Sequence, residues 1–174
     1  MRLHMNKILI ILSFALVVAC SPVEVPEQNL VERNGMVYEI NSSTPFNGIS
    51  LTYHPNGQIE LMTSFKDGVK DGSQILYYLN GQLIRRNNYK NGKFHGVQEI
   101  FSESGVLEEA EIYKNGKQHG VQDLYLEGRL AIRSYWTDGE LDGDPEFYDE
   151  TGSLRSEEIE EIFHLLPLLE EIRE

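Results

Sequence analysis

The sequence predicts a mainly β fold, an elongated antiparallel β-meander of about five hairpin repeats followed by a C-terminal helix. Three observations support it: the spacing of glycines, the alternation of apolar residues between them, and a change to helical spacing near the C-terminus. Glycines recur in steps of 24 residues, except that the steps into Gly128, Gly139 and Gly143 are 23 because one residue is lost before Gly128. Such a period is typical of stacked supersecondary units. The three series are Gly48, Gly72, Gly96, Gly120 and Gly143; Gly57, Gly81, Gly105, Gly128 and Gly152; and Gly68, Gly92, Gly116 and Gly139.

Each repeat has the pattern of a β-hairpin. In the unit from Gly72 to Gly96, alternating residues flank the turn dipeptide Asn80-Gly81, and Lys90-Asn91-Gly92 turns the chain back. We expect the glycines of these series, from Gly57 to Gly143, to be repeat turn glycines. Equivalent apolar residues should stack across the strands as ladders. The columns are Tyr53, Tyr77, Phe101, Tyr125 and Tyr148; Ile59, Leu83, Leu107, Leu130 and Leu154; and Phe65, Tyr89, Tyr113 and Trp136.

The repeats resemble a known family. The segments Tyr-Lys-Asn-Gly-Lys-Phe-His-Gly at 89–96 and Tyr-Lys-Asn-Gly-Lys-Gln-His-Gly at 113–120 are similar to the bacterial MORN-repeat variant. The resemblance covers about residues 47–154, with Asp71 and Asp142 standing where histidine is usual. It implies an elongated antiparallel meander that acts as a scaffold or a membrane-associated module. Bacterial lipoproteins of this type are often described as YwqK-type antitoxins, so the resemblance also implies an antitoxin-like family.

Residues 1–19 have the features of a secretory signal. Arg2 and Lys7 precede a short apolar run, residues 8–18, which is too short to span a membrane. The ending Val-Val-Ala-Cys at 17–20 resembles a lipobox, which implies that Cys20 is lipidated and holds the protein on the bacterial cell envelope. Ser21 then implies the outer rather than the inner membrane. The alternative is an ordinary signal with a chance cysteine.

The remaining chain divides into three parts. Residues 20–29, which include two prolines and no apolar periodicity, are predicted to be a lipidated tether. Residues 30–155 form the repeat domain, in which 36–40 alternates as an N-terminal edge strand. Residues 156–174 are predicted to be a helix, with Ser156 as N-cap and Pro167 as a kink. We expect this helix to cap the last edge of the sheet, and the alternative is a helix that docks a partner. Its apolar positions are Ile159, Ile162, Phe163, Leu166 and Leu169.

The charge of the chain limits its partners. Removing residues 1–19 takes away two of the 15 basic side chains and no acidic one, so 15 − 2 = 13 basic residues face 28 acidic ones, a net charge of −15. Such a surface repels phosphate backbones, which argues against nucleic acid as a partner. The lipid bilayer is therefore expected to be contacted through the acyl anchor, and a protein partner is expected to be basic.

The sequence contains two arrangements that could carry chemistry. His95 and His119 occupy equivalent positions in a column with Asn47, Asp71 and Asp142, which could hold a metal. Members of this column that lie two strands apart are about 9–10 Å from one another, too far for one metal ion to bridge easily. We therefore favour the interpretation that these residues are present because they suit positions beside a turn glycine, and we expect no metal and no cofactor. Glutamates at 108–111 and 157–161 are expected to be solvated faces.

The functional prediction follows from these points. We expect a membrane-anchored cell-envelope lipoprotein whose repeats form a non-enzymatic protein-binding scaffold. The alternative is an antitoxin or immunity protein that neutralises a toxin. We expect no enzyme, since no nucleophile, base and oxyanion donors converge in the pattern.

Overall fold

The computed structural model describes residues 22–155. The predicted signal peptide, Cys20 and the predicted helix at 156–174 lie outside the described residues. Residues 22–29, which the sequence predicts as part of a tether, instead belong to the fold: β1 (Glu24–Pro26) pairs in parallel with β4, and a 3-10 turn covers Glu27–Asn29. Val25 is buried between its neighbours, and that contact explains why this segment is ordered. Among residues 22–155, no helix has the length and apolar character needed to cross a bilayer.

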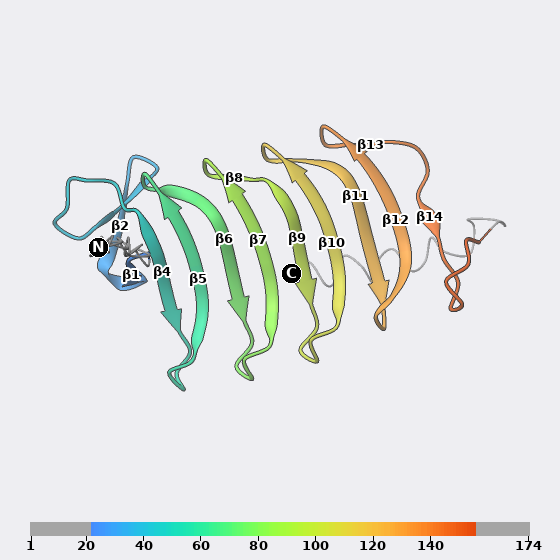
Figure 1. The fold of residues 1–174 in the computed structure, drawn as a ribbon, viewed down its shortest axis with the longest axis horizontal. Coiled ribbons are helices and arrows are strands. Elements are labelled where there is room, and N and C mark those ends of the chain that lie inside the picture. The colour runs from blue at the N-terminus through green and yellow to red at the C-terminus, as the bar shows by residue number, and fades with distance from the viewer. Residues whose placement is uncertain (1–21, 156–174) are drawn as a thin grey trace, which may run out of the picture.

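The repeats form one long meander (Figure 1). The strand order is β1-β4-β5-β6-β7-β9-β10-β11-β12-β13, and every pairing in this sheet after β1 is antiparallel. The fold therefore agrees with the predicted mainly β meander. The strands are β4 (Gly48–Tyr53), β5 (Ile59–Lys66), β6 (Val69–Tyr77), β7 (Leu83–Lys90), β8 (Lys93–Phe94), β9 (Gly96–Phe101), β10 (Leu107–Lys114), β11 (Lys117–Leu126), β12 (Arg129–Thr137), β13 (Glu140–Leu141) and β14 (Glu146–Phe147).

Successive hairpins are joined by hydrogen bonds between their turns, which all lie at the same end of the strands. The backbone N–H of Gly92 donates to the carbonyl of Lys70, 2.8 Å away, and Gly116 donates in the same way to Phe94. Gly68 and Gly139 repeat the contact with Phe46 and Gln118. Each turn is thus bonded to the start of the preceding repeat, so the glycine period of the sequence becomes a physical stack.

Some of the predicted turn glycines lie within strands. Gly72 is inside β6 and Gly120 is inside β11, where the register with the neighbouring strand shifts by a bulge. Gly96 begins β9. All three have positive φ, as do the glycines at the turns themselves. The sequence pattern identifies a positive-φ position and does not distinguish a bulge from a turn.

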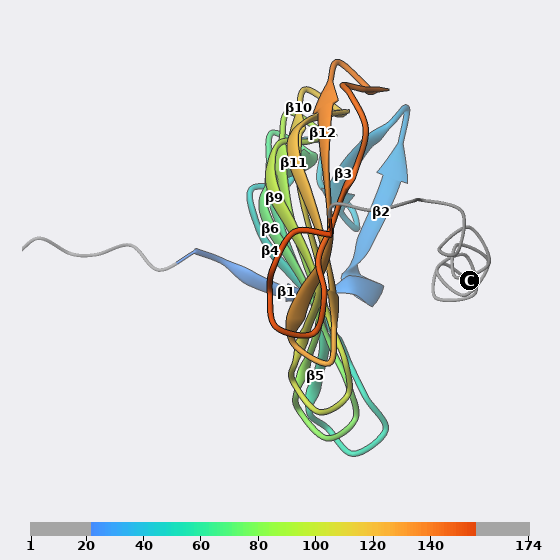
Figure 2. The same ribbon diagram turned by 90° about the vertical axis from the view of Figure 1, so that its right-hand side faces the viewer.

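The sheet is a single layer with a small core. Figure 2 shows it edge-on, with one hairpin standing off its N-terminal end. That hairpin pairs β2 (Leu30–Arg33) with β3 (Met36–Glu39) in a separate sheet, so 36–39 is not the edge strand that the alternation predicts. Of the described residues, only Val25, Phe46 and Leu51 are buried hydrophobic residues, and all three lie at this end.

The middle of the sheet buries polar side chains instead. Thr63 faces Gln74 across β5 and β6, and Gln74 faces Asn87 on β7. Their side chains bond directly, with the Gln74 amide donating to the Thr63 hydroxyl at 3.2 Å and the Asn87 amide donating to Gln74 at 3.4 Å. We call this the polar row. Its members are Ser50, Thr63, Gln74, Asn87, Gln98, Glu111, Gln122 and Ser134.

The predicted aromatic column is present in altered form. Tyr89 and Tyr113 lie two strands apart, and Phe94 fills the space between them, with ring centroids 4.8 Å from Tyr89 and 5.2 Å from Tyr113. A 24-residue period returns the chain to every second strand, so a column read from the sequence lacks the residue of the intervening strand. Tyr53, from another column, is 46% exposed, which shows that the columns are not a closed core.

Candidate functional site

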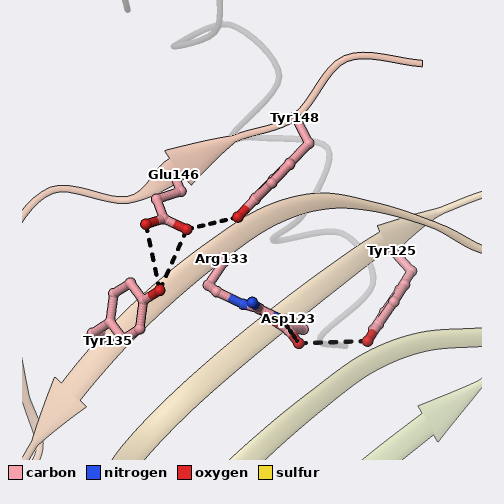
Figure 3. Close-up of polar contacts among 6 residues, drawn as sticks. All are labelled: Asp123, Tyr125, Arg133, Tyr135, Glu146 and Tyr148. Carbon is pink, nitrogen blue, oxygen red and sulfur yellow. Dashed lines mark hydrogen bonds and ion pairs between the residues drawn. The ribbon is translucent and has the colours of Figure 1, made fainter. Parts of the chain in front are cut away.

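An ionic and aromatic cluster lies at the C-terminal end of the sheet (Figure 3). Asp123 on β11 stands directly opposite Arg133 on β12, and Arg133 stands opposite Glu146 on β14. The Arg133 guanidinium donates through Nε to Asp123 Oδ1 at 2.7 Å and through Nη2 to Oδ2 at 2.8 Å. Such a two-pronged contact fixes the guanidinium plane as well as its position. The Arg133 side chain keeps 34% exposure, whereas Asp123 keeps 13%.

Three tyrosines surround this ion pair. Tyr148 donates its hydroxyl to Glu146 at 2.7 Å, and Tyr135 lies 3.4 Å from both oxygens of the same carboxylate. Tyr125 donates to Asp123 at 3.5 Å. Tyr135 is 37% exposed. The cluster therefore presents phenol rings and a guanidinium that are held in place by carboxylates from neighbouring strands.

Contacts within the cluster shift the pKa values of three of its groups. Hydrogen bonding to Asp123 raises the pKa of Arg133 further above its ordinary value, so the guanidinium stays charged. Burial, together with the Asp123 charge, raises the pKa of Tyr125. The hydrogen bond to Glu146 raises the pKa of Tyr148. All three shifts move the pKa values further from neutrality.

The sequence analysis places Tyr125 and Tyr148 in an aromatic column but does not predict the ion pair of Asp123 and Arg133. Asp123 and Arg133 belong to a row of directly paired residues that crosses the sheet, which we call the mixed row. An equivalent ion pair occurs once more in it, between Arg86 and Glu99 at 2.9 Å. A comparison of the residues three positions after each glycine of the first series would have shown the change from apolar to charged side chains. These residues are Leu51, Ile75, Glu99, Asp123 and Glu146. The mixed row is Leu51, Met62, Ile75, Arg86, Glu99, Ala110, Asp123, Arg133 and Glu146.

The column that contains the histidines supports the turns. Asn47 Oδ1 accepts a hydrogen bond from the backbone N–H of Asp67 at 2.9 Å, and Asp71 Oδ2 accepts one from Asn91 at 3.0 Å. His119 Nδ1 lies 3.4 Å from the carboxylate of Asp138, the corresponding residue of the last turn. Within residues 22–155, no three His, Cys, Asp or Glu residues are grouped closely enough to hold a metal. Asn47 and Asp71 thus cap the turn that ends their own repeat, whereas His95 Nδ1 and His119 Nδ1 are buried without a hydrogen-bond partner among residues 22–155.

The other face of the same strands carries an apolar groove of about 880 Å³. Because side chains alternate along a strand, Leu124, Ile132 and Trp136 point away from the mixed row. They line the groove together with Leu141 and Phe147, and Leu141 is 48% exposed. Gln122 and Ser134 of the polar row lie in its floor. Strands β11, β12 and β14 therefore present an ionic cluster on one face and an apolar groove on the other.

Comparison with known proteins agrees with the repeat geometry. Residues 46–67, 70–91 and 94–115 each match the family model described as the MORN repeat variant. No curated protein matches the sequence. The boundaries of the matched segments coincide with the turn stack, since Phe46, Lys70 and Phe94 accept the inter-repeat hydrogen bonds. Residues 22–155 therefore form a meander that carries three MORN-variant repeats, and its ionic cluster lies beyond them.

Proposed function

We propose that this chain is a non-enzymatic protein-binding scaffold, anchored to the bacterial cell envelope through lipidated Cys20, with the outer membrane as the preferred site. The observation that carries the scaffold proposal is the open single-layer sheet, in which only three apolar side chains of residues 22–155 are buried and the face with the ionic cluster is exposed. Repeat architectures of this kind use extended surfaces for binding. The anchor rests on the lipobox-like ending at residues 17–20.

The ionic and aromatic cluster is the best contact surface on this sheet. Tyrosine and arginine are the residue types most enriched among energetically dominant interface contacts. Tyr135 and Arg133 are partly exposed and already held by Glu146 and Asp123, so they lose little freedom when a partner binds. Preorganisation of this kind supports affinity without a large buried area.

The partner is expected to be a basic protein. The net charge of −15 after loss of residues 1–19, calculated from 13 basic and 28 acidic side chains, favours association with a positively charged surface. Attraction between exposed charges is screened over about 8 Å at 0.15 M salt. Capture of the partner should therefore weaken between low and physiological salt.

An antitoxin or immunity protein is the second candidate function. The same acidic charge would complement a basic toxin, and the cluster would serve as the masking surface. The two candidates differ in their partner: a scaffold binds a resident envelope protein, whereas an antitoxin binds an effector that harms cells lacking it. Loss of viability on deletion of this chain, restored by deletion of a basic neighbouring protein, would favour the antitoxin.

Partner capture from detergent-solubilised envelope tests the scaffold proposal. Tyr135→Ala should reduce capture because it removes an exposed phenol from the cluster, whereas Tyr53→Ala should not, since Tyr53 is similarly exposed at the opposite end of the sheet. Equal capture by both variants would refute the assignment of the contact surface. Turnover of any substrate in a broad hydrolase and transferase screen would refute the scaffold.

The anchor has a separate test. Cys20→Ser should release the protein from the membrane fraction, because it removes the residue to which the acyl chains would be attached. Stable anchoring requires several such chains, since one acyl chain binds only marginally. If the variant still sediments with membranes and the signal is still cut at the same bond, the lipoprotein proposal is wrong.

A further inference from the structure

The apolar groove at the C-terminal end lacks a cover among residues 22–155. Leu141 and Leu126 both line the groove, and they are 48% and 68% exposed. A contiguous exposed apolar surface on a small protein marks an interaction site. The open edge of the sheet is not what needs covering, because β13 and β14 already pair with β12. What remains for a C-terminal segment to cover is therefore the groove in the face.

We propose that residues 156–174 dock into this groove as an amphipathic helix of the same chain. The chain ends its described part beside the groove: the backbone N–H of Arg155 donates to the carbonyl of Phe147 at 2.8 Å, and Phe147 lines the groove. Ile159, Ile162 and Phe163 follow the spacing that places apolar residues on one side of a helix. The segment therefore begins beside the groove, within reach of the apolar side chains that line it.

The lengths also agree. The groove crosses β9, β10, β11, β12 and β14, whose paired residues Ile100, Glu109, Leu124, Ile132 and Phe147 follow one another across the sheet. Four strand spacings of about 4.8 Å give roughly 19 Å. Up to Pro167 the segment would extend about 16 Å, and over its full length about 28 Å. A single helical turn beyond the proline is sufficient to reach the far side.

Charge gives this docking a distinct signature. The segment carries Glu157, Glu158, Glu160 and Glu161, and the groove is bordered by Glu108, Glu109 and Glu127. Apolar contact therefore has to overcome repulsion between like charges, which salt screens. Docking of the segment should tighten as salt rises, whereas capture of a basic partner should weaken. The two proposals can fail independently for this reason.

Trp136 reports on the groove directly, because it is the only tryptophan in the chain and it lines the groove. In the unchanged protein, the docked segment should shift the fluorescence emission of Trp136 to shorter wavelength and protect its indole ring from quenching by acrylamide. Phe163→Asp should shift the emission to longer wavelength and increase quenching, with the far-ultraviolet circular dichroism of the sheet retained. The matched control is His164→Asp, which adds a charge at the neighbouring position on the other side of the helix and should leave quenching unchanged.

Two results would overturn the proposal. Equal quenching in the unchanged protein and in Phe163→Asp would mean that the segment does not cover Trp136. Protection that depends on protein concentration would mean that a second copy supplies the cover instead. Protection that is independent of concentration, increases with salt and is lost only in Phe163→Asp is the expected result.

Discussion

At the N-terminal end of the sheet the mixed row is apolar, whereas at the C-terminal end it is ionic. Leu51, Met62 and Ile75 occupy the first three positions, and Leu51 is only 6% exposed. In the last strands the same row contains Arg133 and Asp123, bonded to each other. The backbone pairing is the same in both regions. The difference teaches that the repeat sets the backbone frame while the side chains of the row set its chemistry, and on it rests our proposal that one end provides stability and the other recognition.

The largest expected effect is at the apolar end. Phe46 is 3% exposed and its ring lies 5.9 Å from that of Phe65. Phe46→Ala should lower the free energy of unfolding by about 3–5 kcal/mol, because it removes a large buried side chain and leaves a cavity. Urea denaturation measures this. Tyr148→Ala, which removes an aromatic side chain at the ionic end, should cost less, and a reversed order would contradict the comparison.

A turn glycine provides the next test. Gly68 and Gly92 have φ of +78° and +77°, but a Cβ at Gly68 would lie 2.9 Å from the carbonyl oxygen of Val37, whereas at Gly92 the nearest atom is 3.8 Å away. Valine at either position should cost on the order of 1–3 kcal/mol for backbone strain. Gly68→Val should cost more in thermal melts because the N-terminal hairpin must also move. Glu108→Gln serves as the control and should have little effect.

The polar row is expected to contribute less. Gln98 is 3% exposed; its amide donates to the carbonyls of Asn88 and Gly96, both at 3.1 Å, and its oxygen accepts from the Asn88 N–H at 2.9 Å. Gln98→Ala should cost about 1–3 kcal/mol, because half-buried backbone groups of Asn88 lose their partner. Val97→Ala, one residue away on the other face, is the matched control. Equal urea midpoints for the two variants would show that the row does not join β7 to β9.

The smallest expected effect is a loss of folding stability at alkaline pH, caused by tyrosines at the ionic end of the sheet. The pKa values of Tyr125 and Tyr148 are raised from 10.0 in the folded protein, so the protonated phenols contribute stability that is fully present below pH 10 and is lost as pH rises through the folded values. The urea midpoint should therefore fall as the pH rises above about 10. Tyr148→Phe should reduce that fall. If the urea midpoint of Tyr148→Phe fell as much as that of the unchanged protein, the hydrogen bond from Tyr148 to Glu146 would not be the cause of the loss.

Much of the frame could be predicted from the sequence, because glycine spacing and alternation are local signals. The meander, its hairpins and the positive φ of Gly92 follow from them. Four features did not follow. The polar row and the contact of Phe94 with Tyr89 depend on the strand between two repeats, and β1 depends on a parallel pairing with β4 that no local pattern encodes. The cluster of Asp123 and Arg133 requires the register of the hairpin, which a bulge near Tyr125 shifts by one residue.

Native-state hydrogen exchange along the full-length chain tests the central claim most directly, since it reports local stability strand by strand. The claim is that the N-terminal end holds the fold and that the ionic face of the C-terminal end remains open for recognition. The account predicts the slowest exchange in β4 and β5, which pack with Val25 and Phe46, and faster exchange in β11 and β12. Uniform protection across the sheet, or the slowest exchange in β11 and β12, would contradict it.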